Sequence, residues 1–225
     1  MDFNTINVTN NSNRIQDFFF FQEPAIYTNG AQVFSNSLYH AKLRPHALSG
    51  AVLTFKMSRQ YFAGAQNQAA APAGGRFSGD TTACQPIELA SSDGTTTKCA
   101  TSMSIGPLGL SPAASLDGVQ PGAFRIVAPI YNPKQDGNFH IGSAVQNAAG
   151  GPATVSSFIV AQPNQSLDCQ PVLTFYVQAG ACPIGQMINF TSASDTAAAC
   201  DMSAGDAIFN VTYNVDGTWS VNSAS

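Results

Sequence analysis

The feature that most constrains the fold of this chain is a series of short runs with strand-like patterning. Within each run, apolar residues alternate with polar ones or are β-branched, and Asn, Gly, Pro or Ser bounds the run. The clearest runs span residues 6–9, 14–22, 51–57, 124–131, 155–160, 172–177, 207–215 and 218–221. Because helical periodicity is scarce, they predict an all-β protein, an antiparallel β-sandwich of jelly-roll-like type. Asp216-Gly217, between the last two runs, predicts a terminal hairpin.

Two parts of the chain carry similar motifs in the same order. The matches are Ile6 and Val8 with Ile126 and Val127, Gln16-Asp17 with Gln135-Asp136, Val52-Leu53-Thr54-Phe55 with Val172-Leu173-Thr174-Phe175, and Ala83-Cys84 with Ala181-Cys182. Colinear order favours an internal duplication into two pseudo-repeated halves. One large sandwich would give similar matches, because valine-rich strands and Asp turns resemble one another. Both interpretations stay open at the level of the sequence.

Under the duplication interpretation, the chain divides into two β halves, residues 1–105 and 123–225. The first half carries an Ala, Gly and Gln-rich stretch at about 60–82, which is typical of a loop insert. Residues 106–122 are rich in Pro and Gly and would connect the halves.

Charged residues are unusually rare. Only 10% of the chain is Asp, Glu, Lys or Arg, against about 25% in an average soluble domain, and the net charge is −4. Because Lys and Arg do not cluster, the chain lacks the electrostatic surface that nucleic acid binding needs. No stretch approaches the ~18 consecutive apolar residues of a membrane helix. We therefore expect no nucleic acid partner and no membrane span.

The five cysteines, at positions 84, 99, 169, 182 and 200, include no Cys-x-x-Cys pair, which argues against a structural zinc site. A duplicated chain would place Cys84 with Cys99 and Cys182 with Cys200 in equivalent disulfides, as in a secreted protein. The opening residues lack the basic and then apolar pattern of a signal peptide, which favours the cytoplasm and free thiols if Met1 is native. The two observations conflict, so the compartment stays open.

Three histidines, His40, His46 and His140, are the candidate metal ligands. Converging neutral imidazoles would suit zinc or copper. The commoner alternative is that each one hydrogen-bonds locally at a turn or at the surface. No cofactor is predicted, although a histidine-bound metal or calcium stays open.

Asp17 is the most suggestive carboxylate because it precedes four phenylalanines inside a strand pattern. A carboxylate half-buried beside aromatic rings would have a raised pKa, so Asp17 is a candidate catalytic acid. His40 is the candidate histidine that would take part in the proton transfer. Duplication would also pair Asp17 with Asp136 and Asp93 with Asp195, a set suited to acid–base chemistry or calcium. Except for Asp17, these carboxylates have the sequence context of turn formers.

Aromatic residues are the remaining candidates for a ligand pocket. Side chains alternate along a strand, so if Phe19 and Phe21 fill the core, Phe18 and Phe20 need another cover. That cover would be the other half, a second subunit or a bound apolar ligand. The predicted ligand-binding residues are Phe18, Phe20, Tyr27, Tyr39, Tyr61 and Trp219.

These features support three classes of function. The first is a non-catalytic, lectin-like module whose neutral polar surface binds a neutral small ligand or glycan. The second is a cyclase or isomerase that acts on an apolar small molecule by acid–base chemistry in an aromatic pocket. The third is a self-assembling structural protein. The low charge is compatible with a large buried interface, so we also expect a homo-oligomer.

Overall fold

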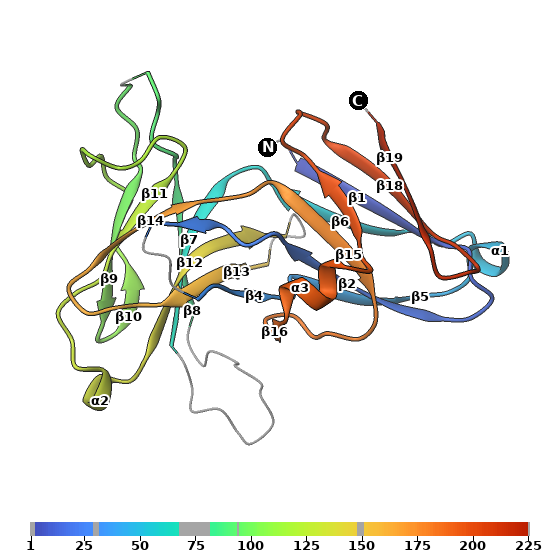
Figure 1. Ribbon diagram of the computed structural model, residues 1–225, viewed down its shortest axis with the longest axis horizontal. Coiled ribbons are helices and arrows are strands. Elements are labelled where there is room, and N and C mark those ends of the chain that lie inside the picture. Colours follow the sequence, from blue (N-terminus) through green and yellow to red (C-terminus); the bar gives the residue numbers. More distant parts are fainter. Residues whose placement is uncertain (1–2, 29–31, 68–81, 94, 148–150, 225) are drawn as a thin grey trace.

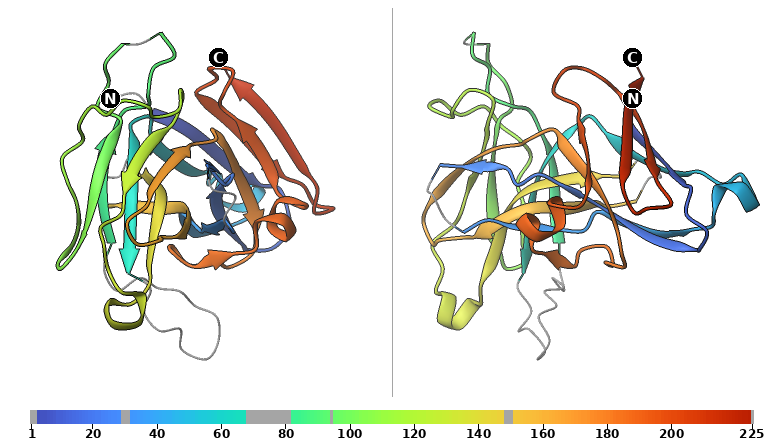
Figure 2. Two further views of the ribbon diagram at one scale, coloured as in Figure 1. Left: turned by 60° about the vertical axis from the view of Figure 1, so that its left-hand side comes forward. Right: turned by 45° about the vertical axis from the view of Figure 1, so that its right-hand side comes forward.

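The structure is a computed structural model of the 225-residue chain, and it describes residues 3–28, 32–67, 82–93, 95–147 and 151–224. Two β-sandwiches lie side by side (Figure 1), and the two turned views in Figure 2 separate them. The all-β prediction is therefore confirmed. No helix in the described ranges has the length and apolar character needed to cross a membrane.

The first sandwich, here called the terminal sandwich, combines strands from the two ends of the chain. One sheet has the order β19-β18-β1-β6 and the other β17-β15-β2-β5. The bounds are β1 Phe3–Asn10, β2 Gln16–Gln22, β5 Tyr39–Leu43, β6 Leu53–Ser58, β15 Thr174–Ala179, β17 Ala198–Asp201, β18 Ile208–Tyr213 and β19 Trp219–Ala224. In Figure 1 its blue and red strands meet on the right-hand side.

The second sandwich, here called the central sandwich, is built mainly from the middle of the chain. Its sheets have the orders β10-β9-β11-β14-β3 and β16-β4-β13-β12-β7-β8. The bounds are β3 Ile26–Tyr27, β4 Phe34–Asn36, β7 Tyr61–Asn67, β8 Thr82–Ile87, β9 Ala100–Ile105, β10 Leu108–Leu110, β11 Phe124–Val127, β12 Phe139–Gln146, β13 Ala153–Val160, β14 Ser166–Gln170 and β16 Met187–Ile188. In the described part of the chain, three short helices lie between strands: α1 His46–Ser49, α2 Pro133–Asp136 and α3 Phe190–Ser194.

The two sandwiches repeat one pairing pattern. β1 pairs parallel with β18 and antiparallel with β6, and β11 pairs parallel with β9 and antiparallel with β14. The order β17-β15-β2-β5 likewise corresponds to β8-β7-β12-β13, with antiparallel pairs throughout. The two parallel pairs depart from the wholly antiparallel sandwich that the sequence predicts, and a jelly-roll connectivity stays a prediction.

Each of the four sheets takes strands from both predicted halves, 1–105 and 123–225. The matched motifs follow the repeated pattern only in part. Ile6 and Ile126 lie in corresponding strands, β1 and β11, whereas Phe55 and Phe175 lie in β6 and β15, which do not correspond. Internal duplication therefore remains a prediction, and the halves are interleaved in space.

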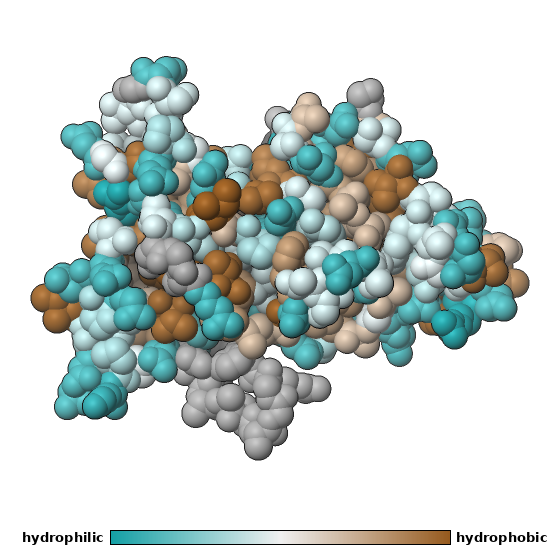
Figure 3. Space-filling model, in the orientation of Figure 1, coloured by the Kyte–Doolittle hydropathy of each residue, from teal (hydrophilic) through white to brown (hydrophobic). Residues whose placement is uncertain are grey.

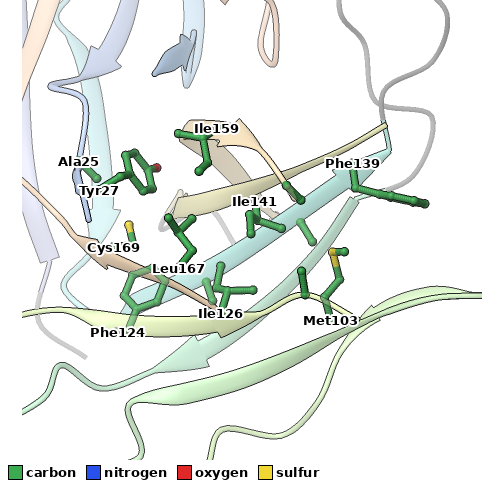
Figure 4. Close-up of a cluster of buried hydrophobic side chains, with 14 of the residues drawn as sticks. Ala25, Tyr27, Met103, Phe124, Ile126, Phe139, Ile141, Ile159, Leu167 and Cys169 are labelled. Carbon is green, nitrogen blue, oxygen red and sulfur yellow. The ribbon is translucent and has the colours of Figure 1, made fainter. Parts of the chain in front are cut away.

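Alternating burial explains how these strands form two cores. Along β1, every second residue is buried, and Ile6 and Val8 pack against Phe18 and Phe20 of the facing sheet. Figure 4 shows the corresponding core of the central sandwich, where Phe124 and other side chains from both sheets converge. The terminal hairpin is confirmed, because β18 and β19 pair antiparallel across Asp216-Gly217.

The phenylalanine run of β2 is buried on both faces of its sheet. Phe18 and Phe20 belong to the sandwich core, while Phe19 and Phe21 pack with Cys182 beneath Phe190 of α3. The premise that Phe19 and Phe21 fill the core is thus wrong, and Phe18 and Phe20 face neither a ligand nor a second subunit. Of the three covers considered, the other half of the chain is the one found, on the face of Phe19 and Phe21. The cover of the other face is the chain's own segment around α3.

The predicted loop insert at about 60–82 is wrong at its start. Tyr61–Asn67 forms β7, whose Ala63 and Ala65 are fully buried. A side chain at Gly64 would approach Val155 Cγ2 to 2.9 Å, so the small residues of this stretch permit close packing of β7 on its neighbours. Residues 68–81 lie outside the described part of the chain. Within the predicted connector, Leu108–Leu110 forms β10.

All five cysteines are free thiols, so of the two alternatives left open by the sequence, the disulfides Cys84–Cys99 and Cys182–Cys200 are wrong. Cys182 and Cys200 lie in different hydrophobic clusters, Cys182 with Phe19 and Phe21 and Cys200 in the terminal sandwich core. Burial raises the pKa of the Cys84 and Cys200 thiols to about 12. These cysteines serve as small apolar side chains.

Candidate functional site

A cavity of about 150 Å³ lies where the open end of the terminal sandwich meets the central sandwich. The terminal sandwich contributes Asn4, Gln22 and Phe175, the central sandwich contributes Tyr61, Phe62 and residues 143–145, and the β6–β7 and β14–β15 crossovers add residues 58–60, Pro171 and Leu173. A cavity of about this volume holds a molecule the size of benzene.

The β6–β7 crossover is held in place by its own side chains. The Ser58 hydroxyl accepts a hydrogen bond from the Gln60 amide at 3.1 Å, and Gln60 Nε2 donates to the Ile87 carbonyl at 2.8 Å. Arg59 Nε donates to Asn4 Oδ1 at 2.9 Å. This bond connects the crossover to β1 and sets the direction of the Arg59 guanidinium at the cavity.

Gln22 supplies the most unusual polar group of the cavity. It follows Phe18 and Phe20 on the inner face of β2 and is only 3% exposed. Its Nε2 donates to the Val172 carbonyl at 2.7 Å, but its buried Oε1 has no hydrogen-bond partner. Leaving a buried acceptor unpaired costs about 1–3 kcal/mol, so Gln22 carries a destabilised polar atom in the wall of this cavity.

The rest of the cavity wall is mainly apolar. Phe62 and Phe175 are buried, and Leu173 and Val145 are half-buried. Tyr61 is half-buried, and burial raises the pKa of its phenol, which keeps the hydroxyl protonated as a donor and acceptor.

Comparison with protein-family models, curated proteins and solved structures found no match for this chain. The chemistry of the cavity therefore has to be inferred from its side chains.

Among the predicted ligand-binding aromatic residues, Tyr61 lines this cavity. Phe18, Phe20 and Tyr27 are core residues instead. The Tyr27 hydroxyl donates to the Ser157 carbonyl at 2.8 Å, and Figure 4 shows its ring within the central core. Tyr39 stacks on Phe55 with a centroid distance of 5.6 Å, and Trp219 packs on Tyr213 at 4.8 Å.

The two predicted catalytic residues, Asp17 and His40, are in contact, and their catalytic role stays a prediction. His40 Nε2 lies 3.0 Å from Asp17 Oδ1, and the two side chains are 25% and 28% exposed. Asp17 and His40 come from the adjacent strands β2 and β5 and share the outer face of their sheet with Phe19. The carboxylate can hold the imidazole in one tautomer, but neither residue lines the cavity between the sandwiches.

The three candidate metal ligands do not converge. His40 lies on β5, His46 in α1 with its Nδ1 3.3 Å from the Ala51 carbonyl, and His140 in β12 of the other sandwich. Within the described ranges, no three His, Cys, Asp or Glu residues form a group able to hold a metal ion. His140 is buried against Phe158 at a centroid distance of 4.5 Å, and burial lowers its pKa to about 4.

The other paired carboxylates occupy turns. Asp93 accepts hydrogen bonds from Ser91 and from the Thr95 amide, which lower its pKa to about 2. Asp136 ends α2 and accepts from the Asn132 amide at 2.8 Å, while Asp195 follows α3. These positions agree with the interpretation of the carboxylates as turn formers. Asp17 lies on β2 and Asp136 at the end of α2, so this predicted pair occupies two different elements.

The sequence does not identify Arg59, Gln22 and Asn4 as site residues. Arg59 lies between a strand-like run and the predicted loop insert, and Gln22 ends the phenylalanine run. Neither has a local pattern that differs from an ordinary surface position. Their grouping depends on the contact between the sandwiches, which local patterning does not encode.

Proposed function

We propose that the protein is a non-catalytic binding module for a small, ring-sized ligand held between its two sandwiches. The observation that carries the proposal is a cavity with aromatic and aliphatic walls that is lined by Gln22, a buried residue whose Oε1 has no hydrogen-bond partner. A ligand hydroxyl or amine would give this oxygen its missing donor, and the ring would pack on Phe62 and Phe175. Sites of this kind, apolar with a few placed polar groups, commonly lie at domain junctions.

A thermal-shift and calorimetry screen tests the proposal. The panel consists of single sugars and hydroxylated six-membered rings, applied to the wild type, Val145→Phe and Val215→Phe. Val145 lines the cavity, so Phe at this position fills it, whereas Val215 is 74% exposed in the terminal hairpin and receives the same substitution as a control. We expect at least one compound to raise the melting temperature of the wild type and the control.

The same compound should bind Val145→Phe at least tenfold more weakly. The proposal would be overturned if no compound of the panel bound the wild type, or if a compound bound Val145→Phe as tightly as the wild type. A folded Val145→Phe protein, judged by its circular dichroism spectrum and cooperative melting, is required for the comparison. If it does not fold, Leu173→Phe on the opposite crossover is the replacement, because Leu173 also lines the cavity.

The Asp17–His40 contact supports a second candidate, acid–base catalysis on an apolar small molecule. A histidine oriented by a carboxylate can transfer a proton to or from a bound substrate. Turnover of a substrate that falls by at least a hundredfold in His40→Gln, with binding preserved, would favour this function over simple binding. Full turnover in His40→Gln would remove the pair from any mechanism.

Self-assembly, the third class, has less support. On the face drawn in Figure 3, hydrophobic residues form small groups separated by hydrophilic ones. The most exposed large apolar residues, Leu48 and Ile130, lie on α1 and before α2, in different sandwiches. Gel filtration and light scattering would test the expected homo-oligomer directly.

A further inference from the structure

We propose that the ligand of the inter-sandwich cavity is a small hydroxylated ring that carries a carboxylate, bound through Arg59. This inference rests on the proposed function and names the chemical class of its ligand. Arg59 is the charged residue among the described residues that line the cavity. The two ion pairs that the structure describes, Asp17 with His40 and Asp168 with Arg125, do not involve it.

The Arg59 side chain is oriented for recognition of an anion. Its Nε donates to Asn4 Oδ1 at 2.9 Å, and Asn4 is itself buried at 8% exposure. This bond fixes one edge of the planar guanidinium and leaves its two terminal nitrogens as donors. A guanidinium with two free donors side by side matches the two oxygens of a carboxylate.

The other walls of the cavity determine the remainder of the ligand. Arg59 is exposed at the cavity mouth, whereas Gln22, Phe62 and Phe175 are buried. A carboxylate at Arg59 therefore places the ring in the buried part of the cavity, where about 150 Å³ accommodates six ring atoms. A rotation of the Gln22 amide would bring Oε1, the acceptor that lacks a partner, within reach of a hydroxyl on that ring.

Matched acids and amides test the proposal. The probes are the three isomers of hydroxybenzoate and the three corresponding hydroxybenzamides, which have nearly the same shape but no charge. Binding to wild type, Arg59→Gln and Arg44→Gln is measured by calorimetry at 50 and 500 mM NaCl. Arg44 is exposed, lies outside the cavity lining and loses the same charge, so Arg44→Gln is the control.

We expect at least one acid to bind wild type and Arg44→Gln at least tenfold more tightly than its amide. Arg59→Gln should abolish this preference while it still binds the amide, and high salt should weaken binding of the acid only. Equal binding of acid and amide to wild type would overturn the carboxylate inference and leave the proposed function standing. If neither acids nor amides bind, while a sugar from the first screen does, the inference also fails. If no compound of either screen binds, the proposed function fails with it.

Discussion

The burial of His140 predicts a specific acid sensitivity of the fold. His140 is 3% exposed, stacks on Phe158 and lies 3.2 Å from Gln66 Nε2 through its Nδ1. Because Gln66 Nε2 is a donor, Nδ1 accepts this bond and the neutral imidazole fits the site. Protonation of Nδ1 would remove the acceptor and leave a charge in an apolar environment.

The sign of the effect follows from proton uptake in the two states. The unfolded chain binds a proton at His140 below pH about 6.5, whereas the folded protein does so only below about 4. Above pH 6.5 His140 is neutral in both the folded and the unfolded state, so its burial makes its full contribution to the free energy of unfolding. As the pH falls from 6.5 to 4, the unfolded state gains protons first, so the free energy of unfolding decreases. It decreases by about 1.36 kcal/mol for each pH unit between these two pKa values, a total loss of about 3 kcal/mol.

Urea denaturation at pH 7.5, 6.5, 5.5 and 4.5 measures this loss in wild type, His140→Phe and His140→Gln. His140→Phe keeps a ring against Phe158, and neither replacement titrates. The carboxylates titrate alike in all three proteins, so the difference in pH dependence between wild type and variants isolates His140. We expect wild type to lose about 2–3 kcal/mol more than either variant between pH 7.5 and 4.5. Parallel pH profiles in the three proteins would refute the reasoning.

Three further predictions concern packing and topology. Gly142→Ala should lower the free energy of unfolding by more than about 3 kcal/mol, because its Cβ would overlap neighbouring backbone and lie 2.8 Å from Phe158 Cα. Gly151→Ala, whose Cβ meets nothing within 4 Å, is the control in the same urea assay. Arg125→Ala should lower the free energy of unfolding by about 3–5 kcal/mol because it removes the cation that neutralises the buried Asp168 carboxylate and leaves it the Gln120 amide as donor. Half-chains cut after Asp117 in the exposed turn should each lack a cooperative thermal transition and regain one when mixed, since every sheet needs both halves. Cooperative melting of either half alone would contradict the interleaved topology.

The local pattern of this sequence predicts strands well where residues alternate or are β-branched. β1, β6 and β18 each fall on a predicted run because one face packs into a core and the other does not, whereas β13 falls on one because its β-branched and aromatic residues are buried on both faces. β7 is not predicted because Ala63, Gly64 and Ala65 do not show the alternation of apolar and polar residues that marks a strand. These small residues are selected by close packing between strands, a property of the assembled sheet.

The arrangement of strands could not be predicted in the same way. β1 and β18 pair in parallel although Ile6 and Phe209 are far apart in the sequence. Such long-range pairing depends on the register of two distant strands and on the core that they share. A division of the chain into consecutive halves therefore describes the sequence motifs better than it describes the sheets.

The candidate site shows the same limit. The sequence names Asp17 and His40 as catalytic candidates and Tyr61 as a candidate pocket residue, but only the pairing of β2 with β5 places Asp17 beside His40. Gln22 and Arg59 become a site only where the two sandwiches meet. Because the chain carries few charges, a single cation such as Arg59 at the cavity mouth dominates the electrostatic potential there.

A crystal structure of the protein with its tightest-binding ring compound tests the central claim most directly. We predict electron density for the ring between Phe62 and Phe175, with a ligand hydroxyl or amine within hydrogen-bond distance of Gln22 Oε1. The ligand bound elsewhere on the surface, with this cavity still unfilled, would contradict the claim.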